Sequence, residues 1–143
     1  MTKGGALAGE TGVMVTVAQI NLVVADLERS RAFYERLGLS FRGRSRHGES
    51  PAEAWVSTNA GIPLVLHSTS FASWWDRSEP QPSAGGPQVD LEIDSVERLE
   101  DVAAGLEALG ATMVKPPTDM PWGQRFAIVL DPDGHRVGLK ASP

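Results

Sequence analysis

The chain has 143 residues, no cysteine and a formal net charge of −5 at pH 7. This length suits a single domain, and the lack of cysteine excludes disulfides, thiolate metal sites and thiol nucleophiles. Lysines and arginines are scattered along the chain, which argues against nucleic-acid binding. No apolar run approaches the ~18 residues of a membrane span, and no signal-peptide pattern opens the chain. We therefore expect a soluble, cytoplasmic domain, preceded by a loose arm over residues 1–12.

The first half of the chain predicts a strand, a helix and three further strands. Residues 13–24 are rich in β-branched side chains, which favour a strand. Asp26 suits the N-cap of the following helix, and Gly38 suits the position just after its end. Three short extended segments then follow, near 39–45, 53–58 and 63–67. Residues 68–86 are polar and rich in Pro and Gly, which predicts a connector.

The second half repeats this order. Apolar residues alternate over 89–93 as in a strand, Ser95 suits a helix N-cap, and Gly110 suits the end of that helix. Three strands are predicted after it, near 111–115, 124–130 and 136–140.

The spacing between the halves indicates a duplication. Gln88 lies 69 positions after Gln19, and Ser95 lies 69 positions after Asp26. Repetition at a fixed separation marks repeated structural units. The sequence therefore predicts two βαβββ modules in tandem.

The last two strands form a predicted hairpin. Its turn is Asp131-Pro132-Asp133-Gly134, whose residue types favour a tight turn. The alternation predicts a core face and an opposite face. The expected core face carries Phe126, Ile128, Leu130, Val137 and Leu139, and the opposite face Arg125, Ala127, Val129, Arg136, Gly138 and Lys140.

Two segments, INLVVADLERSRAFYERLGLSF and WGQRFAIVLDPDGHRVGL, resemble the vicinal oxygen chelate superfamily. That superfamily includes glyoxalase I, extradiol dioxygenases, fosfomycin-modifying enzymes and bleomycin-type resistance proteins. The resemblance implies an α+β fold in which two tandem βαβββ modules form an open curved sheet around a cleft, usually in a homodimer. We expect one domain over 1–143, with module one at 13–67, a connector at 68–86 and module two at 87–140.

The resemblance also implies where a metal would bind. By motif, the four ligand positions of the metal enzymes correspond to Gln19, Val65, Gln88 and Gly138. Valine and glycine side chains cannot coordinate, and two neutral amides are poor ligands for a divalent ion. We therefore predict no metal ligand, no cofactor and no catalytic residue. His67 is the nearest other donor, and we interpret it as a hydrogen-bonding or stacking residue in the pocket wall.

Strand alternation predicts which side chains line the cleft. On the first strand of each module these are polar, namely Gln19 and Asn21, then Gln88 and Asp90. On the later strands of module one we expect Trp55, Ser57, Val65 and His67 to face the cleft, with Val56, Leu64 and Leu66 packing on the other side. The polar residues could also be an ordinary solvated sheet face. Asp90 could act as a general base only if buried.

The tryptophans suggest a binding role. Trp74 and Trp75 lie in the connector, Trp122 in a loop and Trp55 on a strand, and flat rings suit planar ligands. Met120 offers an adaptable wall beside Trp122. As alternatives, Trp122 braces the hairpin, and one of Trp74 and Trp75 fills a seam between modules or subunits. The complete predicted ligand-binding set is Gln19, Asn21, Trp55, His67, Trp74, Trp75, Gln88, Asp90, Met120 and Trp122.

The leading functional hypothesis is a protein that sequesters an aromatic natural product or antibiotic, in the manner of bleomycin-resistance proteins, without metal or turnover. Its expected partners are that small molecule and a second copy of the chain. One alternative is a metal-dependent lyase, isomerase or dioxygenase with non-standard ligands such as Gln19, His67 and Asp90. Another is a metal-free enzyme or accessory protein that acts on a biosynthetic intermediate.

Overall fold

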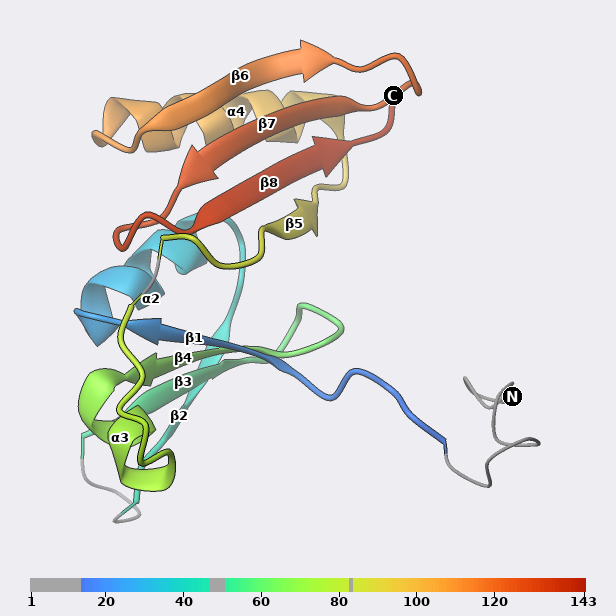
Figure 1. The fold of residues 1–143 in the computed structure, drawn as a ribbon. Helices are drawn as coiled ribbons and strands as arrows, with labels where there is room; N and C mark the ends of the chain where they lie inside the picture. The colour runs from blue at the N-terminus through green and yellow to red at the C-terminus, as the bar shows by residue number, and fades with distance from the viewer. Residues whose placement is uncertain (1–13, 47–50, 83) are drawn as a thin grey trace.

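The computed structural model describes residues 14–46, 51–82 and 84–143, so the predicted arm over 1–12 lies outside the described residues. Two modules lie one above the other in the molecule (Figure 1). The elements in chain order are β1 Ile20–Val24, α2 Leu27–Arg36, β2 Phe41–Arg44, β3 Ala54–Ser57, β4 Leu64–Ser68, α3 Thr69–Trp75, β5 Val89–Glu92, α4 Val96–Ala108, β6 Met113–Asp119, β7 Arg125–Leu130 and β8 Arg136–Ala141.

Each module holds a four-stranded mixed sheet. The strand orders are β1-β4-β3-β2 and β5-β8-β7-β6, so the first strand of each module lies beside its last. These two strands are parallel in both sheets, and the other neighbouring strands are antiparallel. Neither sheet closes on itself. The duplication and the α+β class predicted from the sequence are confirmed.

Both module helices begin and end where the sequence predicted. The Asp26 side chain accepts a hydrogen bond from the backbone N–H of Arg29 at 3.1 Å, and Ser95 accepts one from Arg98 at 3.0 Å. Side-chain acceptors of this kind satisfy backbone donors that a first helical turn leaves free. Gly38 and Gly110 follow the helices with φ of +106° and +95°, a conformation that glycine adopts without strain.

The predicted faces of the first and last strands are confirmed. Leu22 and Val24 of β1 and Leu64 and Leu66 of β4 belong to the main hydrophobic core, which the helices cover. In the second module, Val137 and Leu139 of β8 join the same core, with residues of β5 packed against it.

For β3 and β7 the predicted faces were wrong. Ala127 and Val129 pair with Leu139 and Val137 and are fully buried in the core, whereas Ile128 pairs with Gly138 on the other face. The error arose because β7 is apolar on both faces, so its larger side chains were assigned to the core.

In β3 the register reverses the prediction in the same way. Trp55 pairs with Leu66 and packs against the core on the α2 side, while Val56 pairs with Val65. Ser57 also lies on the α2 face, where its hydroxyl accepts from the backbone N–H of Leu64 at 2.8 Å.

Helix α3 occupies the start of the segment predicted as a connector. Ser68 caps it by accepting from the backbone N–H of Phe71 at 3.1 Å. Phe71 then packs in a small buried cluster with Ala54, Val56 and Val65, on the sheet face that α2 does not cover. The sheet of module one therefore lies between two helices (Figure 1).

Candidate ligand-binding site

The site is built around His67, near the end of β4. The residue is 4% exposed, and its ring lies on the same sheet face as Val65. Phe71 and Trp75 approach the imidazole edge-on, with ring centroids 5.3 and 5.7 Å away. Helix α3 supplies both rings because it begins directly after β4 and folds back over the sheet.

The hydrogen bonding of His67 is incomplete. The indole N–H of Trp75 donates to Nδ1 at 3.3 Å, so a neutral imidazole carries its proton on Nε2. Nε2 is buried and, among the described residues, has no hydrogen-bond partner. A buried donor without an acceptor costs about 1–3 kcal/mol, and such groups in native proteins require an explanation. A ligand that places an acceptor atom near Nε2 would provide such an explanation.

The electrostatic surroundings keep this imidazole neutral. Burial first, and then the positive charge of Arg44, lower the pKa of His67 below its ordinary value. His67 therefore offers a neutral N–H donor near pH 7, suited to a carbonyl, ether or phenolic oxygen.

An aromatic rim surrounds this donor. Trp74 and Trp75 are 57% and 50% exposed although both are large apolar residues. Trp74 stacks at a tilt on Phe71 with centroids 5.6 Å apart, and the guanidinium of Arg46 lies 5.4 Å from the Trp74 ring. Glu53 holds Arg46 in place through paired hydrogen bonds and raises its pKa. This combination of a buried donor, exposed rings and a cation suits a planar ligand.

The polar residues at the starts of the two sheets form matching pairs. The Gln19 side chain donates to the Asn21 side chain at 2.7 Å, and Gln88 donates to Asp90 at the same distance. All four side chains are exposed on the predicted faces. The exposure of Asp90 removes the burial that general-base chemistry would need.

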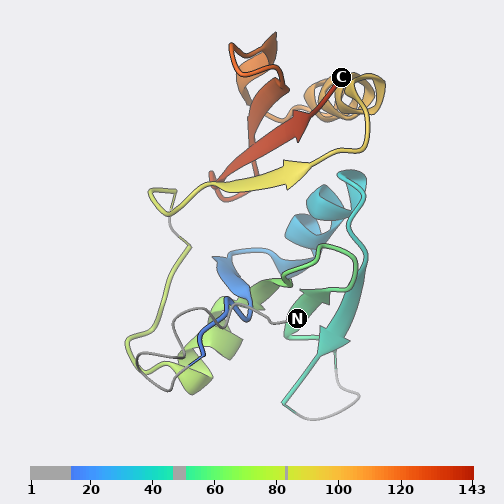
Figure 2. The same cartoon turned by 90° about the vertical axis from the view of Figure 1, so that its right-hand side faces the viewer.

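Three other predicted residues lie away from His67. Trp55 lies on the opposite face of its sheet, where its indole N–H donates to Glu28 and Arg31 stacks on its ring. Its predicted cleft-facing position was therefore wrong. Met120 and Trp122 belong to the turn between β6 and β7, at the far end of the molecule from α3 (Figures 1 and 2).

The four positions that correspond to the family's metal ligands do not fit a metal. Val65 is fully buried under α3. At Gly138 a Cβ atom would lie 2.1 Å from the Asp90 carboxylate, so that carboxylate already fills the space of a longer side chain. Gln19 and Gln88 use their amide N–H groups on neighbouring side chains. This donor set does not match the carboxylate and imidazole ligands that a divalent ion prefers.

A second polar cluster joins the modules. The hydroxyl of Tyr34 in α2 donates to the Asp131 carboxylate at 2.6 Å, and His135 Nδ1 lies 2.9 Å from the same oxygen. Asp133 accepts from the backbone N–H of Ala25 at 3.1 Å. The carboxylates of Asp131 and Asp133 and the His135 ring lie within 4.8 Å of one another. Because hydrogen bonds within the protein occupy these groups, we interpret the cluster as structural, and sequence analysis identified only its turn.

The chain belongs to the Glyoxalase/Bleomycin resistance protein/Dioxygenase superfamily, whose family model matches residues 16–139. Solved structures support the fold. A glyoxalase/bleomycin resistance protein/dioxygenase family enzyme from Burkholderia phytofirmans is 16% identical with a TM-score of 0.73, covering 90% of this chain and 100% of that one.

Two further structures show the same fold. A hypothetical protein from S. aureus is 20% identical with a TM-score of 0.70, over 92% of this chain and 97% of that one. A lactoylglutathione lyase from Agrobacterium tumefaciens is 19% identical with a TM-score of 0.65, over 88% of this chain and 92% of that one. No curated protein matches the chain. Within the described part of the chain, every helix is too short or too polar to cross a membrane.

Proposed function

We propose that this protein binds and sequesters an aromatic small molecule at the surface formed by β4 and α3, without turnover. The observation that carries the proposal is the buried, unpartnered Nε2 of His67 beneath two half-exposed tryptophans. A planar ligand would stack on Trp74 or Trp75 and place an oxygen acceptor on the His67 N–H.

The polar pairs on β1 and β5 supply orienting groups in this proposal. Val23 is the residue of β1 that pairs with His67. Asn21 lies two positions before Val23 and therefore on the same sheet face as His67. Gln88 and Asp90 occupy the matching places on the second sheet. An amide pair and an amide–carboxylate pair offer both donors and acceptors to a polar edge of the ligand.

We further propose that the protein acts as a homodimer. Residues 14–19 lead away from the body of the chain (Figure 1). Met14, Val15 and Val17 are 54%, 77% and 64% exposed in this segment. β1 is also an edge strand of its sheet, and exposed edges with apolar side chains favour pairing with another chain. A second copy would cover these residues.

Quenching of tryptophan fluorescence tests the binding proposal. Titration with a panel of aromatic antibiotics should give saturable quenching near one ligand per site, with the ligand recovered chemically unchanged. Trp74→Ala should weaken binding by about 1–3 kcal/mol, because it removes a stacking surface. Trp122→Ala is the matched control, since Trp122 is similarly exposed (66% against 57%) but lies between β6 and β7 in the other module.

Three results would overturn the proposal. Equal losses of affinity in the Trp74 and Trp122 variants would place the ligand elsewhere. Stoichiometric metal in protein purified without chelators, together with product formation, would favour the alternative of a metal-dependent lyase, isomerase or dioxygenase. Product formation without metal would favour a metal-free enzyme acting on a biosynthetic intermediate.

A further inference from the structure

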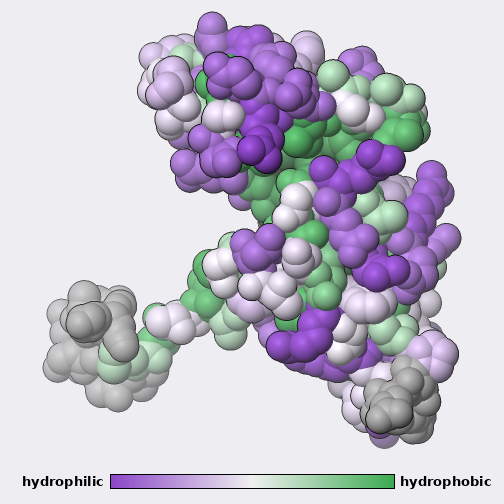
Figure 3. Space-filling view, turned by 180° about the vertical axis from the view of Figure 1, so that it is seen from behind, coloured by the Kyte–Doolittle hydropathy of each residue, from purple (hydrophilic) through white to green (hydrophobic). Residues whose placement is uncertain are grey.

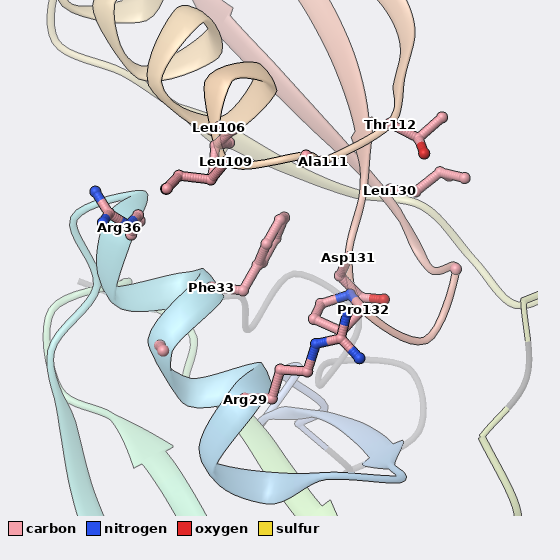
Figure 4. Close-up of a pocket in the computed structure, with 13 residues that line it drawn as sticks. Arg29, Phe33, Arg36, Leu106, Leu109, Ala111, Thr112, Leu130, Asp131 and Pro132 are labelled. Atoms are coloured by element: carbon pink, nitrogen blue, oxygen red, sulfur yellow. The ribbon is translucent and has the colours of Figure 1, made fainter.

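A separate cavity of about 480 Å³ lies between the two modules, on the side of the helices. Its walls are α2, the end of α4 with the residues that follow it, and the end of β7 with the turn that leads to β8 (Figure 4). The His67 surface lies on the opposite face of the first sheet, so the two sites are distinct. Pockets of about 300–1,000 Å³ hold drug-sized ligands, so this cavity is large enough for one.

The middle of the cavity is apolar. The Phe33 ring points from α2 across the cavity toward Leu109, and Leu106 lies beside it (Figure 4). Leu109 directly follows α4 and is 60% exposed, so its side chain is accessible to a ligand. Hydrophobic residues also gather at the waist between the modules in the space-filling view (Figure 3). These side chains would bury an apolar ligand body of modest size.

Two arginines lie at the ends of this apolar strip. Arg29 and Arg36 are seven residues apart on one face of α2, which separates their Cα atoms by about 10 Å at ~1.5 Å per residue. In Figure 4 the Arg29 side chain extends toward Pro132, and Arg36 lies at the opposite end beside Leu109.

Neither guanidinium has an ion-pair partner among the described residues. The neighbouring Arg31 differs, because it pairs with Glu28 and Glu35 on another face of the same helix. Asp131 also lines the cavity, but its carboxylate accepts from Tyr34 and His135. The Asp131 carboxylate is thus already hydrogen-bonded in the contact between the modules. Arg29 and Arg36 remain available to bind an external anion.

We propose that this cavity binds an organic acid with an apolar body, its acid group held by Arg29 or Arg36. Guanidinium groups bind carboxylates through paired, charge-assisted hydrogen bonds, and desolvation at an apolar wall strengthens them. The apolar body lies along Phe33 and Leu109. Such a ligand contacts both modules and therefore links occupancy of this cavity to the contact between them.

Decanoate is the probe for this proposal, and amide chemical shifts of the full ¹⁵N-labelled chain are the measurement. We expect saturable shifts at Phe33, Gly110 and Thr112, and weaker binding of decanol, which has the same chain without the charge. The Arg29→Gln/Arg36→Gln double variant should weaken decanoate binding about tenfold or more. The two single variants show which end holds the acid group.

Two further variants serve as controls. Arg77→Gln removes an exposed arginine outside the cavity and should leave the affinity within about twofold of wild type. Ala32→Trp places a large ring in the cavity wall and should abolish binding while the spectrum stays folded. Equal binding of decanol and decanoate, unchanged affinity in the double variant, or shifts confined to the His67 surface would each overturn the proposal. Absence of shifts at Phe33, Gly110 and Thr112 in folded protein would do so as well.

Discussion

The contact between Tyr34 and Asp131 is expected to contribute substantially to stability, and Tyr34→Phe isolates it. The variant removes only the hydroxyl and keeps the fully buried ring. Asp131 is 5% exposed and accepts four hydrogen bonds, from the Tyr34 hydroxyl, from His135 Nδ1 and from the backbone N–H groups of Asp133 and His135.

The magnitude follows from the charge of the acceptor. A hydrogen bond to a charged group contributes about 1.5–3 kcal/mol, more than a neutral pair, because a buried carboxylate that loses a donor is left incompletely solvated. We therefore expect Tyr34→Phe to lower the free energy of unfolding by about 2 kcal/mol. For a domain of this size, that lowers Tm by roughly 4–8 °C.

Urea unfolding followed by tryptophan fluorescence measures the effect. The matched control is Thr58→Val, which removes an exposed hydroxyl that donates to the Ser40 carbonyl at 3.3 Å. That variant should remain within about 0.5 kcal/mol of wild type. A loss below about 0.5 kcal/mol for Tyr34→Phe, at an unchanged denaturant slope, would show that the hydroxyl does not stabilise the module contact.

Three other predictions follow from the same structure. Burial and the Asp131 charge raise the pKa of Tyr34, so its contribution to stability is complete below about pH 10 and declines above it. As Tyr34 is the only tyrosine, tyrosinate absorbance should rise together with unfolding, and a rise in folded protein would contradict this. The lowered pKa of His67 means that the fold favours its neutral form, so the free energy of unfolding should fall as pH drops below about 6.5. In urea titrations at several pH values, His67→Phe should remove this dependence of stability on pH. An unchanged dependence in the variant would refute the role of His67. Gly138→Ala should cost less than about 1 kcal/mol, because the obstructing Asp90 carboxylate and Gln88 amide are both exposed and can rotate away. A larger loss of stability would show that these two side chains are fixed.

Much of the fold could be predicted because local signals and the repeat agreed. Helix caps such as Asp26 and Ser95 act within a few residues, and a repeat of 69 positions is visible without any structure. The side chains of the first strands were also assigned to the correct faces, since Leu22 and Val24 alternate with polar or less buried neighbours.

The errors fell where both strand faces are apolar. β7 reads Arg125–Leu130 as RFAIVL, and only its register with β8 shows that Ala127 and Val129 face the core. In β3, alternation was assigned with Val56 on the core and Trp55 in the cleft, whereas Glu28 and Arg31 of α2 contact Trp55 on the other face. Alternation gives two faces but does not identify which one meets a helix when both are hydrophobic.

The contacts between modules were not predictable from the sequence. Tyr34 and Asp131 are 97 residues apart, and no local pattern pairs them. Helix α3 did have a local signal, since Ser68 precedes a short run of apolar and aromatic residues and is a favoured N-cap. The sequence analysis assigned this segment to a connector because a proline- and glycine-rich sequence follows it.

In both modules the last-strand position that corresponds to a family metal ligand carries no donor, and a different group occupies the space in each. In module one, Val65 is buried beneath Phe71, so α3 now covers the position that corresponds to a family metal ligand. In module two, Gly138 leaves a space that the Asp90 carboxylate enters from the neighbouring strand. Module one thus presents an apolar, aromatic surface with one donor, at His67, that has no partner among the described residues, and module two presents an exposed acidic group, Asp90. This asymmetry favours the module-one surface as the place where a planar ligand gains most from leaving water.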